Sequence, residues 1–337
     1  MVKLNNKFAI GCLIQWYEVE MYEEYIKSVI ESLNGIENKQ NVVVDICFNL
    51  AQNLEEIDRE KMELGEIYQR FLKTRRELTA QRINHRVNFY PSSIEKSTSK
   101  FLKPYTIADY RREFNDKYCE KVDVLMWGES DSLIPKQTFQ ILDSLHTQVK
   151  DNNPKYCLFF GTCKMWDESW KPVEHVDFTD KPFIENDYDN WWSLKYTMNI
   201  EEMNKINDKV EELDIQVVNP FKFNGCGLVI SSDVVKCGAN IPKSVFFIHE
   251  DTAFQHNMIR LFGEGVPQYV IKNILLVHNR KHPKKRMYIK GESADGVNYY
   301  PRESTDWYTK GNKLCEHNAY NLFNQSKVYT WEDVFKK

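Results

Sequence analysis

The chain has 337 residues, of which 42% are hydrophobic, and this is enough to bury a sizeable core in one large domain or two closely joined ones. Lys and Arg number 45 against 49 acidic residues, so the formal charge of -4 excludes a chain-wide positive field that would attract nucleic acid or an anionic membrane. The N-terminal residues lack a signal-peptide pattern and no apolar run has the length of a membrane span, so we expect a cytoplasmic protein.

The eight cysteines are scattered through apolar segments and include no C-x-x-C pair. This pattern argues against a disulfide framework or a zinc site. We expect them to be small buried side chains in a reduced protein.

Strand-like and helix-like segments alternate in the first half of the chain. Short apolar runs predict strands over residues 8–16, 41–50, 87–91 and 122–127. Apolar residues at helical spacing predict helices over residues 20–33, 54–72 and 106–120. This alternation is typical of parallel strands joined by crossover helices, so the sequence predicts an α/β layered domain.

The second half of the chain is less regular. The segment 166–199 holds four tryptophans among acids and prolines, and we interpret it as a binding loop or lid. Helices are predicted over residues 138–149 and 201–212 and from about 249 to 261, and strands over 155–165 and 270–280. Within 223–231, Gly225 and Gly227 stand just before a further apolar strand and permit close backbone approach. A basic segment, 281–290, precedes a tail of mixed composition that we expect to wrap the domain.

An acid pair stands where the fourth predicted strand must end. Glu129 and Asp131 flank Ser130, and in open α/β sheets ligands bind outside the carboxyl ends of the strands. Hard cations with oxygen ligands bind such carboxylates and recruit phosphates to them. For an isolated E-x-D, a solvated acidic turn is the alternative.

Two later positions carry groups of the same kind. Glu250 and Asp251 follow His249 in the first turn of a predicted helix, where acids either cap the helix or act as a catalytic base. His278 ends the last predicted strand and is either a metal ligand or an ordinary capping or core histidine.

The order of these pieces resembles the GT-A fold of nucleotide-sugar glycosyltransferases, particularly the inverting family-two type, over most of residues 8–283. ESDSLIP, residues 129–135, is similar to the family's D-x-D followed by an apolar pair and a proline. FNGCGLVIS, residues 223–231, looks like its glycine-bearing strand beside the acceptor, and HEDTAF, residues 249–254, like the E-D pair that supplies its base. VHNR, residues 277–280, resembles the late histidine that completes the metal site in some members.

The resemblance implies a fold and a division of the chain. The fold would be a GT-A-like (Rossmann-like) mixed, mostly parallel central sheet flanked by helices. Residues 1–290 would form the glycosyltransferase domain, with a nucleotide-binding half, 1–135, and an acceptor half, 136–290, that carries the aromatic-rich insertion 166–199. Residues 291–337 would be a C-terminal extension packed on that domain.

The resemblance also implies a reaction. It is the metal-dependent transfer of a sugar from a nucleoside-diphosphate sugar, with UDP as the expected nucleotide, to an acceptor hydroxyl with inversion. Asp131, Glu129 and His278 would hold Mn²⁺ or Mg²⁺, and an imidazole ligand favours manganese. Glu129 stands where Asp is usual, so Asp131 is the safer ligand. Asp251 is the first candidate for the base, and Glu250 is the second.

Substrate contacts are expected from residues beside these groups. The donor-binding candidates are Gln15, Trp16, Asn49, Arg111, Arg112 and Ser130. For Arg111 and Arg112, a solvated helix face is the alternative. The acceptor-binding candidates are Gly225, Cys226, Gly227, Trp191, Trp192 and His249.

The acceptor and two other classes of protein stay open. A glycan is one acceptor; the other is a hydroxymethylated base in DNA, as in phage-type DNA glycosylation, which the basic segment 281–290 and the arginine-rich helix around 70–86 favour. A non-catalytic GT-A-like binding module is favoured only by Glu129. A nucleotidyltransferase would leave the late E-D pair unexplained. The sugar and the oligomeric state are not predicted.

Overall fold

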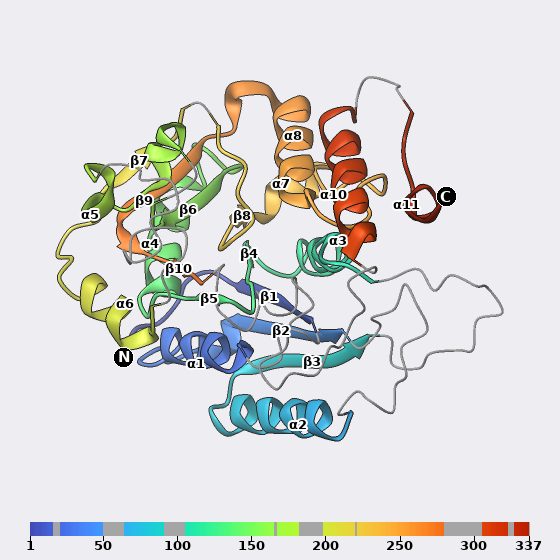
Figure 1. The fold of residues 1–337 in the computed structure, drawn as a ribbon. Coiled ribbons are helices and arrows are strands. Elements are labelled where there is room, and N and C mark those ends of the chain that lie inside the picture. Colours follow the sequence, from blue (N-terminus) through green and yellow to red (C-terminus); the bar gives the residue numbers. More distant parts are fainter. Residues whose placement is uncertain are drawn as a thin grey trace.

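A computed structural model describes residues 1–15, 21–49, 64–90, 105–164, 167–181, 198–219, 221–279, 305–322 and 327–336. In these residues the chain forms a mixed α/β structure around an eight-stranded sheet, as Figure 1 shows. The strands are β1 (Phe8–Gln15), β2 (Val42–Asn49), β3 (Asn84–Tyr90), β4 (Val124–Trp127), β6 (Cys157–Gly161), β7 (Ile215–Val217), β8 (Val229–Ser231) and β9 (Gln268–Leu275).

The sheet is mostly parallel, which confirms the predicted fold class. Its order is β3-β2-β1-β4-β8-β6-β9-β7. The first four strands are parallel to one another, and β6 is parallel to β9. β8 is antiparallel to both of its neighbours, and β7 runs antiparallel to β9 at the edge.

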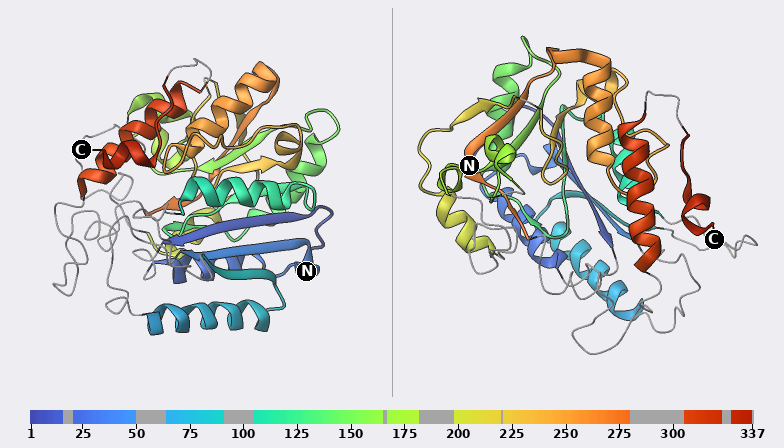
Figure 2. Two further views of the ribbon diagram at one scale, coloured as in Figure 1. Left: turned by 90° about the vertical axis from the view of Figure 1, so that its right-hand side faces the viewer. Right: turned by 45° about the horizontal axis from the view of Figure 1, so that its top comes forward.

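Helices cover both faces of the sheet (Figure 2). One apolar cluster contains residues of α1 (Tyr22–Ser32), α2 (Leu64–Ala80) and α4 (Thr138–Val149). The other contains residues of α3 (Ile107–Tyr118), α7 (Ser232–Lys236) and α8 (Glu250–Phe262). β1 supplies both: Ile10, Cys12 and Ile14 belong to the first cluster, and Ala9 and Leu13 to the second. This alternation shows why a buried parallel strand is a continuous apolar run in sequence.

The C-terminal part forms two helices, α10 (Thr305–Tyr320) and α11 (Trp331–Phe335). Phe246, Cys315 and Val334 form a small apolar cluster, and Asn318 Nδ2 donates to the backbone oxygen of Ser244 at 2.8 Å. These helices therefore pack beside the segment that leads into α8, and Figure 1 shows α10 alongside α8. The predicted division of the chain into domains and halves stays a prediction.

The helix predicted over 138–149 is confirmed as α4, but several predicted bounds were wrong. α2 extends to Ala80 rather than ending at 72, and α6 (Ile200–Asn207) ends before 212. The apolar strand predicted just after Gly225 and Gly227 is confirmed as β8, and the residues ahead of it form a turn that carries the two glycines. Of the insertion 166–199, the described part forms a 3-10 helix over Glu168–Val173 and a short helix, α5 (Val176–Thr179). Among the described residues no helix is long and apolar enough to cross a membrane.

Gly11 of β1 lies where α3 packs closely against the sheet. A Cβ atom at Gly11 would lie 2.5 Å from the Phe114 ring of α3, whereas a Cβ at Gly265 would meet no atom within 4 Å. We expect Gly11→Ala to lower the free energy of unfolding by about 1–3 kcal/mol, because the ring must move within a packed core. Gly265→Ala, the matched control, should stay within about 0.5 kcal/mol of the parent in denaturant titrations. Equal effects of the two substitutions would contradict this packing.

Candidate functional site

The loop after β4 carries the acid pair and folds back against the end of the chain's last described strand. β5 (Ser132–Leu133) pairs antiparallel with β10 (Val277–His278), and His278 is opposite Ser132 in this register. The backbone N–H of Asn279 donates to the backbone oxygen of Asp131 at 2.8 Å. The pairing places the imidazole of His278 beside both acids of the loop.

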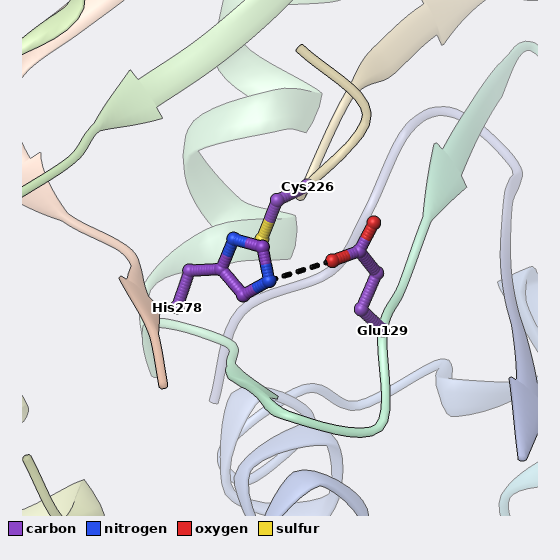
Figure 3. Close-up of side chains that lie close together, drawn as sticks. All are labelled: Glu129, Cys226 and His278. Carbon is purple, nitrogen blue, oxygen red and sulfur yellow. Dashed lines mark ion pairs between the residues drawn. The ribbon is translucent and has the colours of Figure 1, made fainter. Parts of the chain in front are cut away.

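Three side chains of this region form a group that can hold a metal ion. Donor atoms of Glu129, Cys226 and His278 all lie within 4.8 Å of one another (Figure 3). His278 Nε2 is 2.8 Å from Glu129 Oε2 and 3.4 Å from Asp131 Oδ1. Burial alone would lower the pKa of His278, but Cys226, Asp131 and Glu129 raise it well above its ordinary value. Carboxylate oxygen, imidazole nitrogen and thiolate sulfur are ligands of divalent cations, so this donor set fits a metal.

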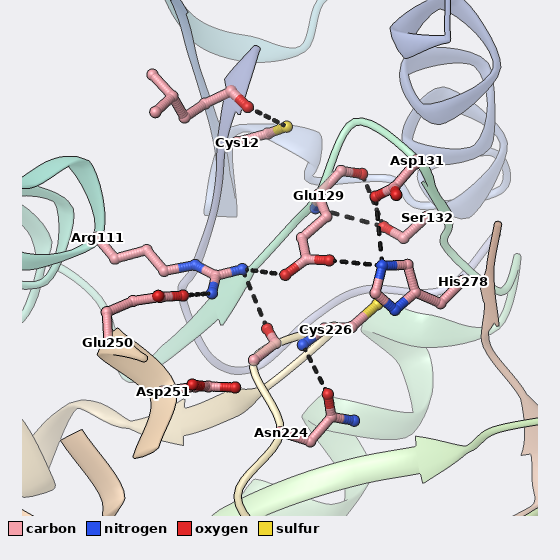
Figure 4. A network of polar contacts seen from close by, with 12 residues as sticks. Cys12, Arg111, Glu129, Asp131, Ser132, Asn224, Cys226, Glu250, Asp251 and His278 are labelled. Atoms are coloured by element: carbon pink, nitrogen blue, oxygen red, sulfur yellow. Dashed lines mark hydrogen bonds and ion pairs between the residues drawn. The ribbon is translucent and has the colours of Figure 1, made fainter. Parts of the chain in front are cut away.

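Arg111 of α3 joins the acid loop to the start of α8 (Figure 4). Its guanidinium is 2% exposed; Nη1 donates to Glu250 Oε1 and Nη2 to Glu129 Oε1 at 2.6 Å. Nη2 also donates to the backbone oxygen of Gly225 at 3.2 Å, and the guanidinium carbon lies 4.7 Å from the centre of the Trp127 ring. One buried cation therefore links three segments: the loop after β4 that carries Glu129 and Asp131 (the acid loop), the turn at Gly225–Gly227 (the glycine turn) and the late E-D pair.

The environment moves the pKa of Glu129 in the opposite direction to those of the E-D pair. Burial raises the pKa of Glu129, but His278 and Arg111 outweigh burial and lower it. Burial raises the pKa of Glu250 to about 7 against the opposing effect of Arg111. Burial also raises the pKa of Asp251, whose Oδ1 accepts a hydrogen bond from the Thr252 backbone at 2.7 Å. A carboxylate with a pKa near the working pH suits general base catalysis.

Gly225, predicted as an acceptor contact, lies between these groups. A Cβ atom there would be 2.5 Å from Arg111 Nη1 and 3.3 Å from Asp251 Oδ2. Any larger residue would therefore displace the guanidinium or the second acid of the pair. Gly227, with φ of +64°, completes the turn in a conformation that glycine adopts without strain.

Other predicted residues take different positions. Gln15 and Asn49 end the parallel strands β1 and β2 opposite each other, and Ser130 is buried in the acid loop. Arg112 donates to the backbone oxygens of Ile241, Pro242 and Val245, which ties α3 to the segment before α8. Trp16, Trp191, Trp192 and the basic segment 281–290 lie outside the described residues.

Two features of the site were not predicted. Cys226 was expected to contact the acceptor and, with the other cysteines, to be merely a small buried side chain, but its sulfur belongs to the metal-capable group. Arg111 was expected to bind the donor or face solvent, yet it is buried between two glutamates. A signal for Arg111 exists in the sequence: it shares a helical stripe with Ala108, Phe114 and Tyr118, and a cation on a buried stripe requires an acidic partner.

Comparisons with known proteins give structural likeness only. No family model matches the chain, and no curated protein matches it. A mycobacterial protein of known structure is similar with a TM-score of 0.43 and 7% identity, over 94% of this chain and 75% of that chain.

Glucosyl-3-phosphoglycerate synthase from Mycobacterium tuberculosis is also similar. Its complex with Mg²⁺ and uridine diphosphate has a TM-score of 0.42 and 8% identity, over 94% of this chain and 79% of that chain. Its complex with Mn²⁺, uridine diphosphate and phosphoglyceric acid has a TM-score of 0.40 and 8% identity, over 84% and 74%. At these TM-scores and identities the likeness assigns neither a family nor an activity to this chain.

Glu250 should make stability depend on pH. Its pKa rises from 4.5 in the unfolded chain to about 7 in the fold. Folding therefore takes up a proton between these values, and the stability present below pH 4.5 is lost as the pH rises through 7. Glu250→Gln keeps the shape of the side chain and an acceptor for Arg111. It should remove a pH-dependent change in the free energy of unfolding on the order of 3 kcal/mol. Denaturant titrations of both proteins across this range measure it, and a constant difference between them would contradict the shift.

His249 should couple the start of α8 to α10. It adopts φ of +65°, and its Nε2 lies 2.8 Å from Asn312 Oδ1. We expect Asn312→Ala to destabilise the parent by about 1 kcal/mol, because the hydrogen bond that opposes the strained backbone is lost. In a His249→Gly background, where neither strain nor bond exists, the same substitution should cost little. A double-mutant cycle measures the coupling, and identical costs in both backgrounds would exclude it.

Proposed function

We propose that this protein is a metal-dependent glycosyltransferase that moves a sugar from a nucleoside-diphosphate sugar, with UDP as the nucleotide, to an acceptor hydroxyl with inversion. The observation that carries the proposal is the link through Arg111 between a metal-capable group and the carboxylate pair Glu250 and Asp251. Sugar transfer needs both kinds of group within one site: one for the leaving diphosphate and one for the attacking hydroxyl.

The metal side of the site is formed by Glu129, Asp131 and His278. When bound there, a divalent cation such as Mn²⁺ or Mg²⁺ neutralises the charge on the departing diphosphate. These side chains fit such an ion because His278 Nε2 lies 2.8 Å from Glu129 Oε2 and 3.4 Å from Asp131 Oδ1. Gln15 and Asn49, at the carboxyl ends of neighbouring parallel strands, are the proposed contacts for the nucleotide.

Asp251 is the proposed base. Glu250 is buried and bound by Arg111, whereas Asp251 is half-buried and its Oδ2 faces the glycine turn. Asp251 would accept the proton of the acceptor hydroxyl as it attacks the anomeric carbon, and Glu250 would hold the start of α8 against Arg111. The raised pKa of Asp251 makes it a stronger base than an ordinary aspartate.

The acceptor is proposed only as a hydroxyl compound. A glycan and a hydroxymethylated base in DNA both fit an aspartate base, and the basic segment that favours DNA lies outside the described residues. Assays with both acceptors at two salt concentrations separate them, because DNA binding weakens with salt through counterion release.

Asp251→Asn and Asp131→Asn test the proposed chemistry. Each should reduce kcat for transfer by about 10²–10⁴-fold, since one loses the base and the other a ligand of the cation. Asp233→Asn, which changes an exposed acid of α7, is the matched control and should retain activity. The donor is found first by screening nucleotide sugars with Mn²⁺ for thermal stabilisation, because a ligand that binds only the native state raises its apparent stability.

The result that would overturn the proposal is equally concrete. If no nucleotide sugar stabilises the protein with Mn²⁺, and both aspartate variants match the parent in every transfer and donor-hydrolysis assay, the site is not that of a glycosyltransferase. If nucleotide sugars bind but are neither transferred nor hydrolysed, the chain is a binding module of the same build.

A further inference from the structure

Cys226 is the one member of the metal-capable group to which the proposed reaction gives no role. Its side chain is buried, with the residue 4% exposed, and its sulfur lies with Glu129 and His278 in the metal-capable group (Figure 3). Carboxylate and imidazole side chains bind many divalent ions. A thiolate is a soft ligand that binds Zn²⁺ and Co²⁺ but not Mg²⁺.

The fold holds this sulfur in place through the residues on either side. Gly225 lies against Arg111, where even a Cβ would be 2.5 Å from Nη1, and Gly227 lies against Leu276 with φ of +64°. The backbone N–H of Cys226 donates to Asn224 Oδ1 at 3.1 Å. The turn is therefore packed against Arg111 on one side and Leu276 on the other, so the side chain of Cys226 has a defined position beside His278.

The geometry points to Cys226 as a metal ligand, so that Glu129, Cys226 and His278, with Asp131 beside them, bind a cation that accepts sulfur more tightly than they bind Mg²⁺. Asp131 Oδ1 lies 3.4 Å from His278 Nε2, which adds an oxygen donor to the nitrogen and the sulfur. The carboxylate, imidazole and thiolate of Glu129, His278 and Cys226 match sites in which three protein ligands hold Zn²⁺ or a similar ion and a fourth position stays open, and Asp131 lies beside them. The inference deepens the proposed function by naming the class of cation, and it rests on that function only for the use of the ion.

Co²⁺ is the probe, because a thiolate bound to it produces a charge-transfer band in the near ultraviolet that oxygen and nitrogen ligands do not. Co²⁺ is titrated into the full-length protein, into Cys226→Ser and into Cys237→Ser. The Cys237 variant removes an exposed cysteine outside the group and is the matched control. We expect the band in the parent and in the control, and its loss in Cys226→Ser with the visible cobalt bands retained.

Calorimetric titration with Zn²⁺ and Mg²⁺ gives a second measure, and Cys226→Ala gives a second variant should the serine perturb the turn. Loss of the sulfur should weaken Zn²⁺ binding at least tenfold, since loss of even an outer-shell partner costs about 10–100-fold, and leave Mg²⁺ binding unchanged. A saturated parent spectrum without the band, or equal Zn²⁺ affinity in the parent and both Cys226 variants, would overturn the inference.

These readouts need neither donor nor acceptor, so they separate the inference from the proposed function. If the band is present and depends on Cys226 but no sugar is transferred, Cys226 is confirmed as a ligand and the proposed glycosyltransferase activity is contradicted. If transfer runs equally well in Cys226→Ser with Mg²⁺ and the cobalt spectra of the two proteins agree, the ligand assignment falls and the glycosyltransferase stands.

Discussion

The site depends on one buried guanidinium. Burying a charge costs several kcal/mol unless it is paired and its donors are satisfied, and breaking one side of such a pair costs about 3–5 kcal/mol. Arg111 is paired with Glu129 and Glu250 and also donates to the backbone oxygen of Gly225, while its buried Nε has no hydrogen-bond partner among the described residues. These partners come from three separate segments of the chain. Because the two terminal nitrogens of the guanidinium make these contacts only when all three segments are in place, Arg111 fixes the acid loop, the glycine turn and α8 relative to α3.

The same arrangement leaves an excess of negative charge. Four carboxylates converge on two cationic side chains: Glu129, Asp131, Glu250 and Asp251 on Arg111 and His278. The excess can be neutralised by protons or by a divalent cation. Neutralisation by protons corresponds to the raised pKa values of Glu250 and Asp251. Neutralisation by a cation would use the metal-capable group of Glu129, Cys226 and His278. Proton uptake at α8 and the proposed cation binding at the acid loop would therefore be coupled through Arg111, since either relieves the same repulsion.

The sequence predicts what depends on local patterns. The continuous apolar run of β1 and the helical spacing of apolar residues in α4 have local physical causes, and the α/β class followed from such elements. The acids at the end of β4 were found because strand ends of α/β sheets bind ligands. The contacts of Arg111 and Cys226 could not be found in this way. They exist because β8 is inserted antiparallel between β4 and β6, which brings the glycine turn between the acid loop and α8. Strand order is a property of the whole chain that no local pattern records.

His249, the residue before the E-D pair, connects the C-terminal helix α10 to the site. His249 has a left-handed backbone that costs a non-glycine residue about 1–3 kcal/mol and persists only where the surroundings impose it. With an ordinary backbone at this residue, α8 would start in another direction and Glu250 would no longer face Arg111. The imidazole that opposes this strain is held by Asn312 of α10. The direction in which α8 presents its two acids is thus maintained from one side by Arg111 and from the other by a helix that begins more than forty residues after α8 ends.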